Sequence, residues 1–118
     1  MSGMTSRMTS AARAYQAGAT HRSPRAQEAE VFETTNAALR VARGADGLAR
    51  ARALADNRRL WITVNDLMCD PTNALPTELR AAIVSVGLAV RREMEREAPN
   101  FDFLIAVNEN LAAGLAAG

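Results

Sequence analysis

Apolar residues recur three and four positions apart along most of the chain, which is the spacing of one face of an α-helix. Residues 76–98 give the clearest example, where Leu79, Ile83, Val86 and Val90 follow one another at intervals of four, three and four. No run of five or more residues alternates between large apolar and polar side chains, as a half-buried strand would. The pattern therefore predicts an all-α protein.

Residues that start and stop helices divide this pattern into four main segments. Ser accepts hydrogen bonds from the free amides of a first turn, and Pro fits that turn because its missing N–H costs no bond there. Ser23 and Pro24 therefore mark the first start. Gly and Pro end helices. The predicted main helices span residues 23–43, 47–69, 76–98 and 101–113.

A shorter helix is predicted over residues 10–18, anchored by Tyr15 and ended by Gly18. With the four main helices it makes a compact helical array, which we expect to form one domain over residues 10–118. Residues 1–9 lack a periodic apolar pattern and are expected to form a flexible tail. This tail contains three candidate starts of the native chain: Met1, Met4 and Met8.

The apolar stripes of the main helices are expected to meet in one core around Trp61. Trp61 is predicted to pack against Leu79, Ile83 and Val86 of the helix at 76–98. The stripe predicted on the helix at 23–43 consists of Val31, Thr35, Ala38 and Ala42, with Phe32 and Leu39 beside it.

Charge and cysteine content narrow the class of protein. The formal net charge is +1, and acidic and basic residues are interspersed, which argues against a nucleic-acid or anionic-membrane surface. A single cysteine permits no internal disulfide, which fits a reducing compartment. No apolar run approaches the roughly 20 residues of a membrane span, and the N-terminus lacks a secretory apolar region. We therefore expect a cytoplasmic protein.

Residues suited to catalysis or metal binding are few. His21 is the only histidine and lies in a predicted loop, where a solvated side chain is the simplest interpretation. Cys69 is interpreted as a half-buried, inert thiol at a helix end, because a nucleophile needs a base nearby. Asp66 and Asp70 are explained by a solvated face and a helix stop. No zinc or nucleotide motif is present, so we predict no catalytic residue, no metal site and no cofactor.

An arginine-rich stretch over residues 49–61 raises the alternative of nucleic-acid binding. Arg52 and Arg59 share a helix face, but Asp56 lies between them and Arg50 points elsewhere. Arginines interrupted by an acidic residue in this way are poorly placed to bind the successive phosphates of a nucleic-acid backbone. Nucleic acid is therefore not the expected partner.

Two features leave a choice between packing and partner binding. Val84 and Leu88 lie one turn apart, away from the main apolar stripe of their helix. A helix that is apolar on more than one face is either central in the bundle or offers a face to a partner. Residues 57–59, Asn-Arg-Arg beside Trp61, are either a polar cluster that fixes packing or the rim of a binding groove.

Four segments in this order resemble the FlaF family of flagellar biosynthesis regulators: AYQ, SPRAQEAEVF, NRRLWITVNDLMCDPTNALPTELRAAIVSVG and FLIAVNENLAAGL. They cover almost the whole chain from Ala14 to Leu115, and the residues before Ala14 exceed the short start that the family usually has. The matching residues that we expect to support the fold are Ser23, Pro24, Asn57, Leu60, Trp61, Asn73, Leu75, Pro76, Leu79 and Arg80, together with the core positions Ile83 and Val86.

The resemblance implies a role in flagellin production and export. Family members are thought to bind flagellin, to act with the post-transcriptional regulator FlbT, and to promote flagellin synthesis or secretion without catalysis. A helical protein could hold a terminal flagellin helix in an apolar groove. The alternative is a regulator that acts on flagellin messenger RNA, directly or through FlbT. The residues expected to contact a protein partner are Tyr15, Arg58, Val84, Leu88, Leu104, Asn108 and Leu111.

Overall fold

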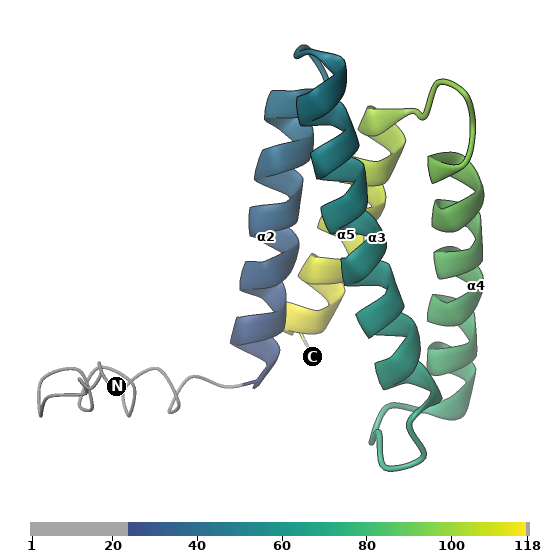
Figure 1. Cartoon of the computed structure of the whole chain (residues 1–118). Helices are drawn as coiled ribbons and strands as arrows, with labels where there is room; N and C mark the ends of the chain where they lie inside the picture. Colours follow the sequence, from purple (N-terminus) through teal and green to yellow (C-terminus); the bar gives the residue numbers. More distant parts are fainter. Residues whose placement is uncertain (1–23, 118) are drawn as a thin grey trace, which may run out of the picture.

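The computed structural model describes residues 24–117, and these form four helices with no strand among them (Figure 1). The all-α prediction is confirmed. The short helix predicted at 10–18 and the N-terminal tail lie outside the described residues. The helices are α2 (Pro24–Ala42), α3 (Gly47–Cys69), α4 (Thr77–Met94) and α5 (Phe101–Ala117).

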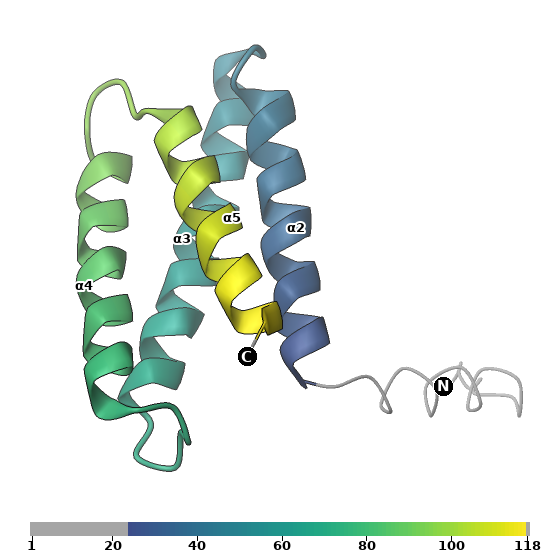
Figure 2. The same cartoon turned by 180° about the vertical axis from the view of Figure 1, so that it is seen from behind.

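Neighbouring helices run in opposite directions and are joined by short turns (Figure 1). Helix α2 packs on both α3 and α5, although α2 and α5 are the first and last helices described. Side chains connect α5 to α3. Helix α4 lies against α3 and meets α5 mainly near the turn that joins them, so α4 and α5 diverge along their lengths (Figure 2). One side of α3 is therefore left without a full helical cover.

The turn between α3 and α4 is held by side chains that satisfy free backbone groups. Asn73 donates from Nδ2 to the carbonyl of Leu67 at 2.8 Å and accepts from the N–H of Leu75 at 2.9 Å. Arg80, from the first turn of α4, donates to the carbonyls of Leu75 and Met68 at 3.0 and 3.2 Å. These bonds set where α4 starts relative to the end of α3.

The core contains Trp61, which is only 4% exposed, as predicted. Ile83 is buried in the same cluster, as predicted, and two further neighbours were not predicted. Trp61 makes an edge-to-face contact with Phe32 at a centroid distance of 6.4 Å. A Cβ added to Gly87 would lie 3.2 Å from Cε3 of Trp61, so the missing side chain lets α4 approach the indole closely.

Three residues predicted for the core are exposed: Val31 by 52%, Leu79 by 46% and Val86 by 41%. On α4 the cause is the approach at Gly87, which turns a face containing Ile83, Val90 and Met94 inward. Leu79 and Val86 then fall on the flank of that face. On α2, Val31 is displaced because the inward face is centred on Phe32, Asn36 and Leu39.

Three fully or almost fully buried asparagines, one each from α2, α3 and α5, meet beside Trp61. Asn108 donates from Nδ2 to Oδ1 of Asn57 at 2.7 Å and to Oδ1 of Asn36 at 3.0 Å. Its own Oδ1 accepts from Nε1 of Trp61 at 2.8 Å. Each buried polar group that is paired in this way avoids a desolvation penalty, and the pairing fixes the register of the helices.

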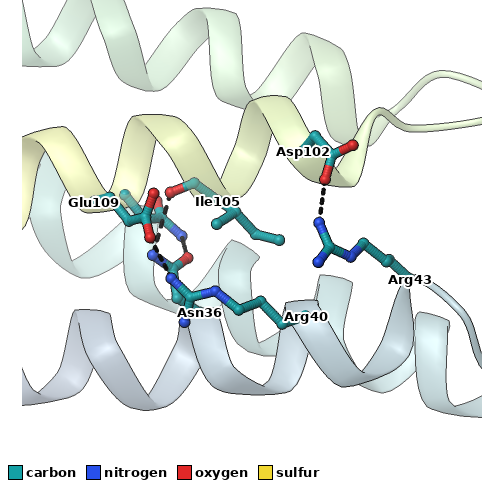
Figure 3. A network of polar contacts seen from close by, with 7 residues as sticks. Asn36, Arg40, Arg43, Asp102, Ile105 and Glu109 are labelled. Atoms are coloured by element: carbon teal, nitrogen blue, oxygen red, sulfur yellow. Dashed lines mark hydrogen bonds and ion pairs between the residues drawn. The ribbon is translucent and has the colours of Figure 1, made fainter.

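The outer members of this amide network tie it to the helices around it. Asn36 donates from Nδ2 to the carbonyl of Ile105 at 3.2 Å, and Asn57 donates from Nδ2 to Sδ of Met94 at 3.3 Å. Figure 3 shows Asn36 directed at Ile105, together with two ion pairs between α2 and α5. These pairs, Arg40 with Glu109 and Arg43 with Asp102, are solvent-exposed and add little stability.

The turn between α4 and α5 depends on a carboxylate. Oε2 of Glu93 accepts from the N–H of Asn100 at 2.8 Å and from Nη1 of Arg96 at 3.0 Å. The bond from Asn100, with a further contribution from Arg96, holds the pKa of Glu93 below its ordinary value of 4.5. The carboxylate therefore connects the end of α4 to the start of α5.

Acid is expected to weaken this turn. Because the pKa of Glu93 is lowered by folding, its contribution is complete above pH 4.5 and is lost as pH falls through the folded-state pKa. Glu93→Gln should make the free energy of unfolding less dependent on pH between about 5 and about 3 than it is in the wild type. Urea unfolding at several pH values in this range measures the pH dependence of the free energy of unfolding. Glu97→Gln, in the same turn, is the control. An equal loss of pH dependence in both variants would contradict the role assigned to Glu93.

Candidate binding groove

The described residues offer little for catalysis. Among residues 24–117 no group of three His, Cys, Asp or Glu side chains is arranged to hold a metal ion. Cys69 is exposed, which corrects the prediction of a half-buried thiol: α3 ends at this residue and its side chain points to solvent. His21 lies outside the described residues. No helix in the described part is long and apolar enough to cross a membrane.

The most distinctive surface feature is an apolar groove with a volume of about 90 Å³. Its accessible lining contains no polar surface. All four helices contribute to it: the first half of α2, the second half of α3, one residue of α4 and the second half of α5. The lining residues are Val31, Phe32, Leu60, Thr63, Val64, Leu67, Met68, Ile83, Leu111 and Leu115.

The depth of the apolar groove varies along its lining. Phe32, Leu60, Val64 and Met68 are buried and form its floor, while Val31 and Leu67 are exposed and form its edge. Thr63 contributes its methyl group, because its hydroxyl donates to the carbonyl of Arg59 at 3.1 Å within α3. The groove can therefore accept an apolar side chain without leaving a polar group unpaired.

Helical spacing extends the apolar surface beyond the groove. On α4, Leu79 and Val86 lie one turn on either side of Ile83 on the same face, and both are exposed. On α5, Val107 and Phe103 lie one and two turns before Leu111 in the same way. The helices α4 and α5 themselves diverge from the turn that joins them (Figure 2).

The predicted partner contacts fall in different places. Leu111 lines the apolar groove. Leu104 and Asn108 are fully buried, so we correct their assignment from a binding surface to the core. They lie one turn apart on the face of α5 that meets α2 and α3. The remaining predicted contact in α5 is therefore Leu111 alone.

Three other predicted contacts, Arg58, Val84 and Leu88, do not line the groove. Val84 is half-buried against the core, and Leu88 is exposed on the flank of α4 opposite Leu79 and Val86. Arg58 is exposed on α3, and Tyr15 lies outside the described residues. The structure therefore does not bring the predicted contacts together into one surface.

Sequence reasoning assigned Val31, at one edge of the groove, to the core, because it belongs to the apolar stripe predicted for its helix. The other edge, at Leu67, has a signal in the sequence: on α3 the apolar residues at 60, 61, 64, 67 and 68 form a broad arc.

Several arginines are engaged within the domain. The guanidinium of Arg50 lies 4.6 Å from the ring centroid of Phe101 and donates to the carbonyl of Arg43 at 3.2 Å. Arg59 pairs with Asp56 one turn away on α3. This use of charge leaves the arginine-rich stretch a weak candidate for following a phosphate backbone.

Comparison with known proteins adds one positive result. The family model described as flagellar protein FlaF matches residues 11–115, which include all four helices except the last residues of α5. The match also takes in residues 11–23, ahead of α2. Neither the curated proteins nor the solved structures that were compared contain a match to this chain.

Proposed function

The chain belongs to the flagellar protein FlaF family, and from this premise we propose that it binds a terminal helical segment of flagellin during flagellum biogenesis. The proposal is one of binding without catalysis, in the cytoplasm. Unpolymerised flagellin has terminal segments that become amphipathic helices in the filament. Covering such a segment would prevent premature polymerisation and keep flagellin ready for export.

The observation that carries this proposal is the apolar groove. A helix-in-groove complex needs a wholly apolar floor and apolar walls that can receive side chains at positions i, i+3 and i+4 of the partner. Phe32, Leu60 and Val64 provide the floor, and the exposed Val31 and Leu67 border it. The surface of α4 at Leu79 and Val86 would lengthen the contact.

A single charge at the edge of the groove tests the site. Val31→Asp should leave the helical circular dichroism nearly unchanged, since Val31 is exposed. It should lower the affinity for flagellin at least about tenfold, because the partner's apolar side chains would desolvate the carboxylate. Val41→Asp is the matched control: the same substitution on the same helix, at a position far from the groove. Equal affinities of the two variants would contradict the groove as the site.

Leu88→Asp examines an exposed apolar position on the opposite flank of α4 from Leu79 and Val86. If the groove is the site, this variant should bind flagellin like the wild type. Loss of binding in Leu88→Asp with none in Val31→Asp would move the contact to the outer flank of α4. Flagellin truncated at either end would identify which terminal segment is bound.

The second candidate function is regulation of flagellin messenger RNA, directly or with FlbT. The pairing of Arg59 with Asp56 and the contacts of Arg50 make direct RNA binding the less favoured reading. A flagellin leader transcript, titrated in moderate salt beside flagellin itself, distinguishes the two. Tight, salt-resistant RNA binding by the isolated protein would favour the alternative.

A further inference from the structure

We propose that two copies of this chain associate through the outer face of α3, with the two α3 helices antiparallel and a two-fold axis at Ile62. The outer face of α3 is defined by residues that recur three and four positions apart: Ala55, Arg58, Ile62, Asp66 and Cys69. This contact goes beyond the proposed function and does not use the apolar groove.

The outer face of α3 is turned away from α5. Trp61 meets α5, where it donates to Asn108, and Ile62 follows Trp61 with a rotation of about 100° around the helix axis. Figure 1 shows α5 behind α3 and no described helix in front of it. Ile62 is 48% exposed, and the other members of the face are exposed except Ala55, which is half-buried. Burying Ile62 against a partner would remove apolar surface from water.

Charge on the outer face of α3 is self-complementary. Arg58 lies one turn before Ile62, and Asp66 lies one turn after it. A two-fold axis at Ile62 that makes the helices antiparallel therefore places Arg58 of each copy opposite Asp66 of the other. A parallel pair in register would instead place like charges opposite each other, which is unfavourable. The charge pattern selects the antiparallel arrangement.

Arg58 and Asp66 form no ion pair with any other residue in the range 24–117. The positions three and four residues away from Arg58 hold no acid, and those around Asp66 hold no base, so neither charge is paired along α3. Arg59, by contrast, pairs with Asp56. Two opposite charges, equally spaced about one apolar side chain and unpaired in this part of the chain, fit a contact between identical surfaces.

Helix α4 adds a second apolar residue on the same side. Gly87 lies against Trp61, and α3 and α4 run in opposite directions. The residues that follow these two, Leu88 and Ile62, therefore turn to the same side of the helix pair. Leu88 is 45% exposed. The two-fold axis brings α4 of both copies to one side of the α3 pair, so both leucines would be covered together with both isoleucines.

Charge reversal in the full-length protein tests the contact by analytical ultracentrifugation. Wild type should form dimers at about 0.5 mM or below. Arg58→Asp and Asp66→Arg should each weaken dimerisation by about tenfold or more, because the two-fold axis repeats each like-charge contact. The double variant Arg58→Asp/Asp66→Arg should return to within about threefold of wild type.

Arg52→Asp is the matched control for these reversals, since Arg52 lies on the side of α3 that faces α2. It should dimerise like wild type. A monomeric wild type at that concentration would overturn the proposal. A double variant as weak as the single variants would overturn it as well.

The native cysteine tests the register of the two helices. Ala55 lies seven residues before Ile62 and Cys69 seven after it, so the two-fold axis places each opposite the other. Ala55→Cys should give a dimer linked between residues 55 and 69 under mild oxidation. Within one helix these residues are about 21 Å apart at 1.5 Å per residue, too far for a disulfide. Ala55→Cys/Cys69→Ser should give little linked dimer; links mainly between two copies of residue 55 would overturn the register.

Flagellin is the alternative occupant of the outer face of α3. Ile62→Asp should abolish the dimer and leave flagellin affinity unchanged, since Ile62 does not line the apolar groove. A monomeric wild type that loses flagellin binding on Ile62→Asp would overturn the proposal and assign this face to flagellin. A wild-type dimer that binds no flagellin would support the contact and refute the proposed function.

Discussion

Replacing Asn108 by leucine is expected to lower the free energy of unfolding by about 3–6 kcal/mol, although the leucine side chain has the same branching and the same number of heavy atoms. The reason is the amide network. Asn108 supplies both acceptor and donors to Trp61, Asn57 and Asn36, at 2.8, 2.7 and 3.0 Å. Without it, these three buried polar groups lose a partner at once, and each unsatisfied group costs about 1–3 kcal/mol.

Urea unfolding followed by circular dichroism measures this loss. Asn110→Leu is the matched control, since it makes the same substitution two residues later at an exposed position of α5. That variant should stay within about 0.5 kcal/mol of the wild type. If Asn108→Leu were as stable as Asn110→Leu, the three asparagines could not be cooperating in the core.

Trp61→Ala is expected to cost about 3–5 kcal/mol, as for other buried aromatic residues. It removes the edge-to-face contact with Phe32 and leaves a space facing Gly87, which has no side chain to fill it. It also deprives Oδ1 of Asn108 of its donor. Trp61→Phe should cost less, because it keeps most of the volume and loses mainly the hydrogen bond.

Thermal unfolding of the two variants provides the comparison. Phe103→Ala is the control, because Phe103 is a partly exposed aromatic residue on α5 and should contribute much less. A melting temperature for Trp61→Ala within a degree or two of the wild type would mean that Trp61 is not the centre of the core.

Sequence periodicity predicted most of the fold. The bounds of α3 agree with the prediction, because Asp46 and Pro71 are unambiguous signals at its two ends and the side chain of Asp46 accepts from the N–H of Ala49. The end of α5 was placed too early, at residue 113, since Gly114 looked like a stop. The helix continues through Gly114, where nothing approaches the position of its missing side chain.

The orientation of α4 was the main error, and its cause lies in a single residue. Periodicity shows that α4 has an apolar arc, but it does not say which part of the arc faces α3. The approach at Gly87 decides this, and it leaves Leu79 and Val86 outside. The groove takes residues from all four helices, so it could not be read from the pattern of apolar residues in any one of them.

The amide network was equally hidden. Asn57 was noted for its place beside Trp61, but Asn36 and Asn108 are polar residues far apart in the chain that apolar patterning counts as surface. Their burial depends on three helices meeting at one point. A single sequence contains no local signal for such a meeting.

The same amide network holds three of the four helices directly and the fourth only weakly. Its shortest bonds join α2, α3 and α5, whereas α4 is reached only through the thioether of Met94, a weak acceptor. Helix α4 is therefore attached by its packing on α3 and by the turns at its two ends, while the amide network fixes the other three helices to one another largely without it.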